Sequence, residues 1–406
     1  MGQAKREWEE ALARGFHDIG DKFVCEACFG DDAIRDFIRQ NDEAKHCDYC
    51  GRNSEGSDVC AAPIDAVMAV IVEGIEQEWA EPTADGVSWI SREGGWQSLV
   101  YDTSELFDGY IKDELEIDGG DLLDDIIESV GDKQWCQKDH LRLPPGKDMI
   151  YGWEQFSHAV KYKTRYMFFD WSEGDVSYGS PDEIPPSEML KRIGKSLEET
   201  GLLKTIPEGS RFFRARPHKE DEIYTTARDL GPPPCECALS NRMSPAGIPM
   251  FYGAGDAETA IAETGAIVTV GAFDTVKALT VLDLHNVPPF PSLFDRNRRH
   301  LRGLHLFLRD FVTDLSRPIV KDGREHIDYV PTQIITEYFR HQFRAADGQH
   351  VHGILYPSSR REGGMCCVLF CSQENCTEKP HDSWKETDQW LRLDVKSITR
   401  EKAKRD

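Results

Sequence analysis

Apolar side chains recur at helical spacing through the first half of the chain. Five of them fall at the three- and four-residue intervals of one helix face: Ile64, Val67, Met68, Ile71 and Ile75. The pattern predicts a helix that begins at Pro63 and reaches Trp79, with Pro82 ending it.

The same half contains four further segments that favour helix. They are residues 1–20, 121–132, 153–169 and 187–201. Asp121 is a candidate N-cap for the second of these, and Gly201 suits the C-terminal end of the last. Pro181, Pro185 and Pro186 predict a loop before that last helix. Residues 1–200 are therefore expected to form a mainly helical domain.

After Gly201 the spacing changes to short runs typical of strands. They are SRFFRAR (210–216), IPMFYG (248–253), AIVTVGAF (266–273), ALTVLDL (278–284), HGILYP (352–357) and MCCVLFC (365–371). Helical stretches at 257–265 and 302–315 lie between them. Such alternation predicts an α+β domain over residues 205–400, and residues 399–406 are expected to form a frayed tail.

The charge of the chain is unevenly distributed and supports a boundary near residue 200. The formal net charge is −24, and the first 200 residues hold 20 basic and 44 acidic side chains. The remaining 206 residues hold 28 of each, so the whole excess lies in the first half. An acidic surface repels phosphate backbones, which argues against nonspecific nucleic-acid binding by this half.

Two pairs of cysteines have the spacing of a structural zinc site. Cys25-x-x-Cys28 and Cys47-x-x-Cys50 are separated by eighteen residues, as in a four-cysteine zinc ribbon. Four protein ligands leave no open coordination position, so the expected zinc is structural. We place this ribbon at about residues 21–60, with His46 and Cys60 as lower-ranked substitute ligands.

Nothing in the sequence predicts a membrane segment or a signal peptide. The first residues are polar and charged, and the most apolar window, residues 61–75, is interrupted by Asp65 and too short to span a bilayer. Paired cysteines of the metal-binding kind favour a reducing compartment. We therefore expect a cytoplasmic protein.

The segment at residues 240–265 carries the candidate chemistry of the second half. A loop with Arg242 leads to a strand with Tyr252, and a turn then leads to a helix that Asp256 caps and that carries Glu263. This strand–turn–helix order brings Tyr252 and Glu263 toward one cleft. Far downstream, Ser358 follows the end of another strand. Each residue alone is more often a surface or core residue than a catalytic one.

Taken together, these residues resemble the RES domain family, which is named for its Arg, Glu and Ser. Arg242, Tyr252, Glu263 and Ser358 follow the family order at compatible spacing. Arg214 in FFRAR matches an early family arginine, and DYVPTQIITEYFR (328–340) is typical of one RES subgroup. The resemblance covers about residues 205–380. It leaves the serine position open between Ser358 and its neighbour Ser359.

The resemblance implies an ADP-ribosyltransferase-like fold and an enzyme that degrades NAD, as growth-arresting toxins of the family do. Arg214, Arg242 and Tyr252 are then expected to bind NAD, because an arginine fork grips a pyrophosphate and a tyrosine ring stacks on nicotinamide. Glu263 would stabilise the positive ribose of the transition state, and Ser358 would hydrogen-bond the ribose or carboxamide.

The resemblance is compatible with several reactions and partners. The acceptor in the NAD reaction is inorganic phosphate or water, and a second reading is ADP-ribosyl transfer to a macromolecule. A third is a non-catalytic module that senses NAD. A cognate antitoxin or regulatory protein and a second copy of the chain, as a homodimer, are candidate partners.

The first half resembles the HEPN/RES N-terminal domain that precedes RES domains in longer proteins. VCEACFGDD, HCDYCGR and WEQFSHAVKYKTRYMFF carry this likeness. HEPN domains often have an Arg and a His spaced for ribonuclease activity. Arg39 with His46 and Arg299 with His305 have permissible spacing, but the first pair lies in the zinc module and the second in the RES half.

Six other side chains are of types found in active or metal sites. Cys366 and Cys367 are expected to be core thiols because their run is strand-like and apolar. His326 and Gln333 are candidates to line the pocket. Cys235 and Cys237 offer a less favoured second metal site.

Overall fold

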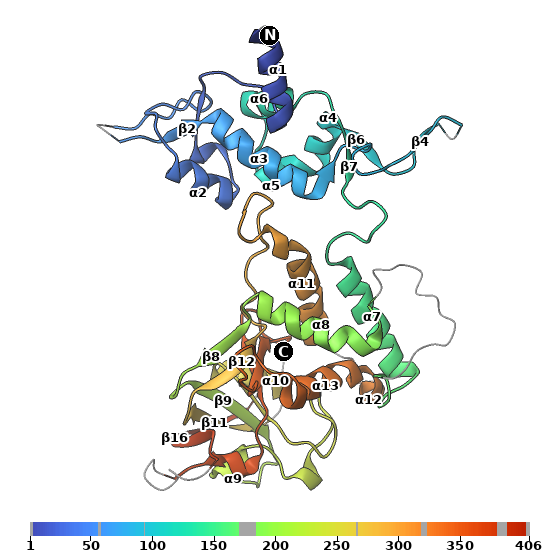
Figure 1. Ribbon diagram of the computed structural model, residues 1–406. Coiled ribbons are helices and arrows are strands. Elements are labelled where there is room, and N and C mark those ends of the chain that lie inside the picture. Colours follow the sequence, from blue (N-terminus) through green and yellow to red (C-terminus); the bar gives the residue numbers. More distant parts are fainter. Residues whose placement is uncertain are drawn as a thin grey trace. The chain divides into compact units, whose positions relative to one another are not determined.

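The computed structural model of the chain describes residues 3–55, 58–92, 94–169, 184–264, 267–317, 323–379 and 388–402 (Figure 1). Contacts divide the chain into two compact units. The first unit holds residues 1–145 and 290–303, and the second holds 146–289 and 304–406. This division falls at Pro145, whereas charge and spacing suggest one near residue 200. The domain limits 1–200 and 205–400 stay a prediction.

The helices of the first unit lie largely where apolar spacing predicts them. They are α1 (Gln3–Arg14), α2 (Asp32–Gln40), α3 (Ile64–Glu78), α4 (Thr103–Leu106), α5 (Lys112–Leu115) and α6 (Asp121–Val130), with a 3-10 turn η1 (Glu26–Cys28), a π-helical turn η2 (Phe107–Ile111) and a second 3-10 turn η4 (Arg299–Leu301). The helix predicted from Pro63 is confirmed as α3, and its five spaced apolar side chains are fully buried. The N-cap of α6 is Gly120 at φ 93°, so capping by Asp121 is wrong.

Short strands in the first unit were not predicted from the sequence. They are β1 (Phe23–Cys25), β2 (Ala61–Pro63), β3 (Trp79–Ala80), β4 (Trp89–Ile90), β5 (Gly95–Trp96), β6 (Val100–Asp102) and β7 (Gln134–Gln137). β1 pairs with β2, β4 pairs with β5, and β3, β7 and β6 form a three-stranded sheet. Runs of two to four residues are too short to show a clear alternation of apolar and polar positions.

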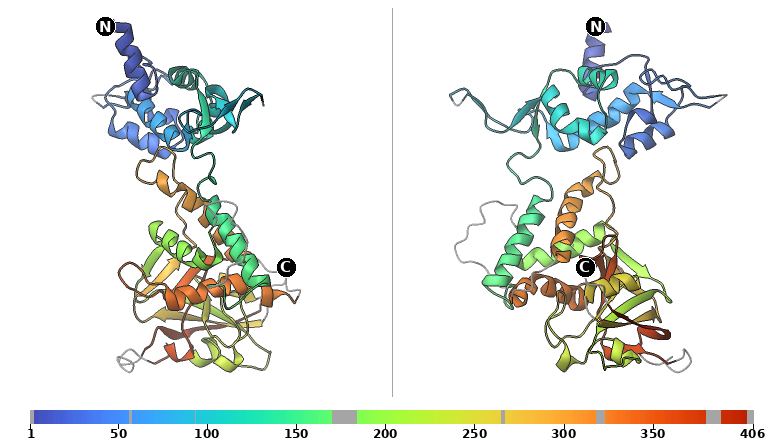
Figure 2. Two further views of the ribbon diagram at one scale, coloured as in Figure 1. Left: turned by 45° about the vertical axis from the view of Figure 1, so that its right-hand side comes forward. Right: turned by 180° about the vertical axis from the view of Figure 1, so that it is seen from behind.

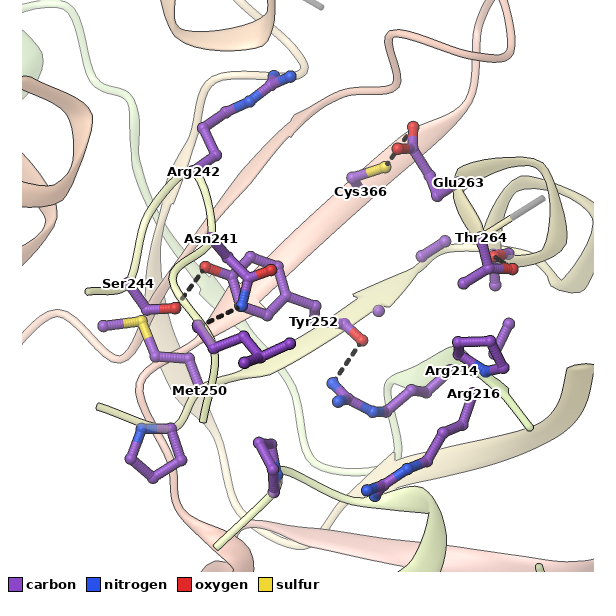
Figure 3. Close-up of a pocket in the computed structure, with 18 of the residues that line it drawn as sticks. Arg214, Arg216, Asn241, Arg242, Ser244, Met250, Tyr252, Glu263, Thr264 and Cys366 are labelled. Atoms are coloured by element: carbon purple, nitrogen blue, oxygen red, sulfur yellow. Dashed lines mark hydrogen bonds between the residues drawn. The ribbon is translucent and has the colours of Figure 1, made fainter. Parts of the chain in front are cut away.

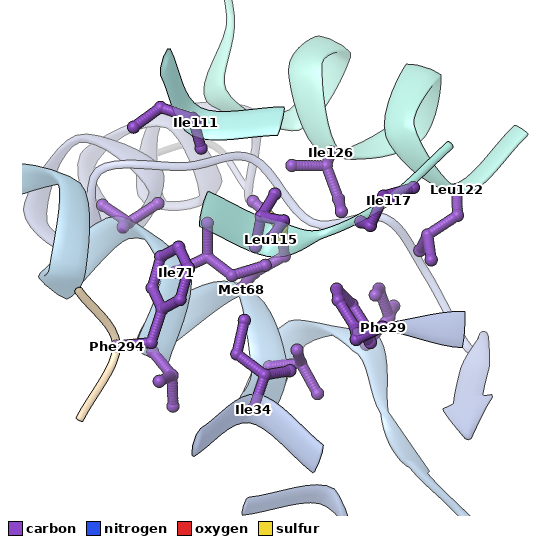
Figure 4. Close-up of a cluster of buried hydrophobic side chains, with 14 of the residues drawn as sticks. Phe29, Ile34, Met68, Ile71, Ile111, Leu115, Ile117, Leu122, Ile126 and Phe294 are labelled. Atoms are coloured by element: carbon purple, nitrogen blue, oxygen red, sulfur yellow. The ribbon is translucent and has the colours of Figure 1, made fainter. Parts of the chain in front are cut away.

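The core of the first unit is completed by a segment from far along the chain. Leu293 and Phe294 are buried in the same cluster as Ile34, Met68 and Ile71 (Figure 4). Phe294 lies against Gly74 of α3, where a Cβ atom would stand 2.6 Å from the ring.

Arg302 anchors the C-terminal end of the segment 290–303 to the rest of the first unit. Arg302 donates to Glu78 at 2.7 Å and to both carboxylate oxygens of Glu114 at 2.6 and 3.1 Å. Its side chain is only 10% exposed, so the two carboxylates compensate a largely buried charge. Residues 290–303 are therefore structural members of the first unit, although the sequence separation exceeds 180 residues.

The helices of the second unit include two from the predicted N-terminal half. They are α7 (Lys147–Tyr162), α8 (Pro186–Glu199), α9 (Ala227–Leu230), α10 (Ala257–Thr264), α11 (Arg302–Ser316, from Leu304 onward), α12 (Glu325–Asp328) and α13 (Val330–Glu337), with short turns η3 (Cys235–Cys237), η5 (Tyr338–Gln342) and η6 (Gln373–Asn375). α8 begins on Pro186, which the sequence placed in the preceding loop, and it is followed by Gly201 at φ 67°, as the sequence predicts. Pro181 lies outside the described residues.

α7 confirms the helical face predicted from residue 153, with different limits. Trp153, Phe156 and Val160 are buried. The helix ends at Tyr162, and Met167 is 67% exposed, so extending this face to Met167 is wrong. Figure 2 shows α7 and α8 next to each other in both views, in agreement with their many contacts.

One nine-stranded mixed sheet forms the centre of the second unit. Its order is β15-β16-β11-β9-β10-β14-β13-β12-β8. The strands are β8 (Leu203–Ile206), β9 (Arg211–Pro217), β10 (Phe251–Ala254), β11 (Ile267–Thr275), β12 (Leu279–Asp283), β13 (Gly353–Pro357), β14 (Met365–Leu369), β15 (Cys376–Thr377) and β16 (Leu391–Lys402). All six predicted runs contain a strand, which confirms the α+β class.

The frayed tail predicted for residues 399–406 is wrong in its first part. β16 continues to Lys402 and pairs antiparallel with β11, from Ile267 opposite Lys402 to Thr275 opposite Leu391. Backbone pairing with a buried neighbouring strand outweighs the polar composition of this segment. Residues 403–406 lie outside the described range.

The sheet of the second unit separates two apolar clusters. Val368 packs in a cluster with Phe307 and Phe311 of α11, while Cys367 and Leu369 pack in another with Phe251 and Phe273. Neighbouring residues of β14 thus point to opposite faces, as expected for a strand. Across the described ranges, no helix is long and apolar enough to cross a membrane.

Candidate active site

A cavity of about 520 Å³ opens in the second unit, among β9, β10, α10 and β14 (Figure 3). Its lining includes Arg214, Arg242, Tyr252 and Glu263, four of the five sequence-predicted site residues of this half. Ser359 also lines it, whereas Ser358 reaches it through a hydrogen bond to Glu263. The predicted residues therefore gather in one place.

The turn between β10 and α10 sets the positions of Tyr252 and Glu263. Asp256 accepts a hydrogen bond from the Thr259 backbone N–H at 2.8 Å, so it caps the helix as predicted. Gly253 allows β10 to approach β9, because a Cβ atom there would stand 3.1 Å from the Phe213 carbonyl oxygen. The local sequence thus holds the strand end and the helix start close together.

Two neutral donors converge on one oxygen of Glu263. The Ser358 hydroxyl donates to Oε1 at 2.6 Å, and the Cys366 thiol donates to the same atom at 3.6 Å. Burial, followed by the charge of Glu263, raises the pKa of Cys366 to about 12, so the thiol stays protonated near neutral pH. Cys366 is buried, as expected, but it lines the cavity and contacts the candidate catalytic carboxylate instead of packing in the core.

Arg214 places a positive charge in the wall of the cavity. It extends from β9 and donates through Nη1 to the Tyr252 carbonyl oxygen at 2.8 Å. Its Nε atom is shielded from solvent and has no hydrogen-bond partner among the described residues. Burial, followed by repulsion from Arg216, lowers the pKa of Arg214 to about 10, which leaves the side chain protonated at neutral pH.

Arg242 lines the other side of the cavity. Its Nη1 donates to the Leu315 carbonyl oxygen at 3.1 Å, near the C-terminal end of α11. Arg216 and Arg360 also line the cavity. Its described lining therefore holds four arginines and one carboxylate, that of Glu263. The excess of positive charge suits a ligand with several negative charges.

Three tyrosines of the described lining, Tyr252, Tyr329 and Tyr356, add aromatic surface. The Tyr252 hydroxyl shares a hydrogen bond of 2.9 Å with the Ser244 hydroxyl, and burial raises the pKa of Tyr252 to about 12. Tyr356 of β13 lies in the same lining, and burial raises its pKa as well. The phenols of Tyr252 and Tyr356 are therefore neutral hydrogen-bonding groups at neutral pH.

Arg216, Ser244, Tyr356 and Arg360 were not predicted from the sequence as site residues. A signal existed for Arg216, because residues two apart on a strand share a face and Arg214 was already a candidate. Ser244 and Tyr356 reach the cavity through the pairing of distant strands and a loop, for which the sequence carries no comparable signal.

Of the remaining candidate residues, Cys237 lines the cavity, whereas His326, Gln333 and Cys235 do not. Gln333 does not line the cavity but supports its loop, donating to the Asn241 carbonyl oxygen at 2.8 Å. His326 lies on α12 and is also absent from the lining. Within the described part of the chain, Cys235 and Cys237 belong to no group of potential metal ligands.

The HEPN-type pairs are engaged in other contacts. Arg39 forms ion pairs with Glu26 and Asp36, and His46 shares a hydrogen bond of 2.9 Å with Asn53. Arg299 donates to Glu73 at 2.7 Å. These are structural contacts: the side chains of Arg39 and His46 are exposed, whereas that of Arg299 is only 14% exposed.

The four predicted zinc ligands form a cluster in the first unit. Their sulfur atoms all lie within 4.8 Å of one another, with Cys25–Cys50 at 3.4 Å and Cys28–Cys47 at 3.6 Å. A tetrahedral site with metal–sulfur bonds of about 2.3 Å has sulfur atoms roughly 3.8 Å apart. The Cys25 backbone N–H also donates to the Cys47 sulfur at 3.3 Å, as suits a thiolate. The cluster could therefore bind a metal ion, whereas Cys60 and His46 stand outside it.

Family models match two parts of the chain. Residues 40–173 match the HEPN/RES N-terminal domain 1, and residues 211–394 match the RES domain. No curated protein and no solved structure is similar enough to count as a match. The resemblance of both halves is thereby confirmed: in this chain a HEPN/RES N-terminal domain precedes a RES domain.

Proposed function

We propose that this protein degrades NAD by breaking the bond between nicotinamide and ribose. The RES family is generally associated with enzymes that act on NAD, and a RES domain suggests a toxin-type function. The observation that carries the proposal is the cavity whose described lining combines four arginines with one carboxylate, that of Glu263. Such a lining offers cations for a pyrophosphate and an anion for a positively charged ribose.

In this proposal the arginines bind and orient NAD. Arg214 presents a buried guanidinium with an unsatisfied Nε atom, and Arg242 faces the cavity from the opposite loop. Guanidinium forks bind phosphate oxygens in pairs, which fixes the orientation of the ligand as well as its position. The Tyr252 ring is available to stack on the nicotinamide.

The proposed chemical step uses Glu263 for electrostatic stabilisation. The C1′–N bond breaks with its electron pair moving onto the ring nitrogen, so nicotinamide leaves as a neutral molecule. The ribose gains positive charge, which the Glu263 carboxylate stabilises. An oxygen of inorganic phosphate or water then forms the new bond to C1′, and a water acceptor releases one proton. The Ser358 hydroxyl holds the carboxylate through Oε1.

Further parts of the proposal concern the whole protein. We propose one structural zinc ion on Cys25, Cys28, Cys47 and Cys50 in a ribbon-like module, and an ADP-ribosyltransferase-like arrangement of the RES sheet. Twelve cysteines without a disulfide support a reducing, cytoplasmic location. A cognate antitoxin or regulatory protein and a homodimer remain proposed partners.

The test is product analysis with purified protein. NAD is incubated with the protein in the presence and absence of inorganic phosphate, and products are identified by mass. Free nicotinamide with ADP-ribose, or with ADP-ribose phosphorylated on the same C1′ atom, supports the proposal and identifies the acceptor. Radiolabel that stays on a macromolecule would instead indicate ADP-ribosyl transfer. NAD that binds and is recovered unchanged would indicate a sensing module and contradict the proposed activity.

A further inference from the structure

The turn that carries Ser358 is organised around its hydroxyl oxygen. Ser358 Oγ accepts hydrogen bonds from the backbone N–H groups of Arg360 and Arg361, both at 3.1 Å. The Ser358 N–H donates to the Gly364 carbonyl oxygen at 2.7 Å, which closes the turn. Because these two N–H groups occupy its lone pairs, the hydroxyl directs its own proton to Glu263.

The side chain of Arg361 joins this turn to the first turn of α10. Nη1 donates to Asp256 Oδ2 at 3.0 Å and to Thr259 Oγ1 at 2.9 Å. Nη2 donates to Glu258 Oε2 at 2.7 Å. One residue therefore bonds to Ser358 through its backbone and to the helix that carries Glu263 through its guanidinium.

Packing makes this junction sensitive to small displacements. Gly364 is buried against α10, and a Cβ atom there would stand 2.8 Å from Thr259 Oγ1. For Asp256, burial opposes ionisation, but hydrogen bonds from Thr259 and the charge of Arg361 lower its pKa overall. The carboxylate is therefore ionised at neutral pH and pairs with Arg361 as an anion.

We infer that Arg361 is a positioning residue, which holds the Ser358 turn in register with α10 so that the serine hydroxyl meets the Glu263 carboxylate. Its effect on rate rests on the proposed function. Arg361 itself does not line the cavity. Its side chain is 40% exposed and that of Asp256 is 44% exposed, so these ion pairs contribute little to global stability. An effect on rate should therefore exceed any effect on stability.

Arg361→Met tests this by removing the guanidinium while keeping an unbranched side chain. We expect kcat for NAD loss to fall about ten-fold with KM changed less than two-fold, because the cavity arginines are untouched. Arg361→Lys should recover part of the rate, since it keeps the charge and loses the fork. The matched control is Arg211→Met, which breaks bonds of a comparably exposed arginine to Asp274 and Asp394 outside the cavity.

Hydrogen exchange provides a readout that does not depend on turnover. Arg361→Met should speed amide exchange in residues 358–364, and Arg211→Met should not. Asp256→Asn keeps a side chain that can cap the helix. It should also speed exchange and lower kcat, by smaller factors than Arg361→Met. If Arg361→Met does not fold, Asp256→Asn takes its place in the test. If the wild type leaves NAD intact, the proposed function fails and exchange alone decides the structural claim. If Arg361→Met has the same amide exchange and the same kcat as the control Arg211→Met, the inference is overturned.

Discussion

The Ser358 hydroxyl lies 2.6 Å from Oε1 of Glu263 and donates a hydrogen bond to it, although 95 residues separate the two in sequence. Ser359, its neighbour, lines the cavity directly and makes no such bond within the described structure. The sequence left the functional serine open between these two residues. The geometry favours Ser358 as the partner of the carboxylate.

The two serines should therefore differ on mutation. Ser358→Ala removes a hydrogen bond to a charged group, worth about 1.5–3 kcal/mol, which corresponds to roughly 10- to 100-fold in the rate of NAD loss. Ser359→Ala should change the rate by less than about three-fold and act mainly on KM. Steady-state kinetics of both variants decide between them, and the reverse ranking would assign the role to Ser359.

Between pH 6 and 9, the rate of NAD loss should show no ionisation of the Cys366 thiol or the Tyr252 phenol. The pKa values of Tyr252 and Cys366 are raised to about 12, so their neutral forms persist through pH 6–9. Tyr252→Phe and Cys366→Ala should leave the shape of the pH–rate profile unchanged in this range, whatever they do to its height. A limb between pH 7 and 9 that either substitution abolishes would show that the group ionises in the working enzyme.

Iodoacetamide at pH 8 should label exposed Cys235 and Cys237 and spare Cys366.

The cysteine cluster predicts the metal content of the protein. Protein purified without chelator should contain one zinc ion per chain, and Cys50→Ser should lose most of it. Cys60→Ser is the matched control, because its sulfur donates to the Lys45 carbonyl oxygen outside the cluster. Metal removal should speed amide exchange in residues 21–63 and leave the RES sheet protected. Wild-type protein without zinc, or equal loss of metal from both variants, would contradict the site.

The packing of Phe294 on α3 predicts a stability effect within the first unit. Gly74→Ala should destabilise it by about 1–3 kcal/mol, because the new Cβ would stand 2.6 Å from the Phe294 ring. Gly109→Ala is the control, since no atom lies within 4 Å of its Cβ position. The double variant Gly74→Ala/Phe294→Ala should lose less unfolding free energy than the two single variants lose together. Thermal or denaturant unfolding measures these free energies. Simple additivity would mean that the contact is not tight in solution.

Sequence patterns predicted the elements whose side chains alternate or recur regularly. The buried strand at 267–275 and the helix at 64–78 are examples, because their apolar faces are continuous. β16 was missed because LRLDVKSITREK mixes charged and apolar residues, and its pairing with β11 supplies the backbone bonds that composition does not reveal.

The candidate site was partly predictable for a related reason. Tyr252 and Glu263 follow each other through a short turn, so local geometry places them together. Cys366 and Arg360 enter the cavity region only through the pairing of β14 with β10 and β13, which no local pattern encodes. The same limit applies to Arg302, whose partner Glu78 lies 224 residues away.

The measurement that tests the central claim most directly is NAD loss by Glu263→Gln. Glutamine keeps the shape of the side chain and removes the charge that would stabilise the ribose, so turnover should fall about 10²–10³-fold with NAD affinity little changed. Glu208→Gln, on the turn before β9 and outside the cavity, controls for loss of a surface carboxylate. Binding is measured by calorimetry under conditions where the variant does not turn over. Slow turnover with intact binding is the predicted result, and wild-type turnover by Glu263→Gln would contradict the account.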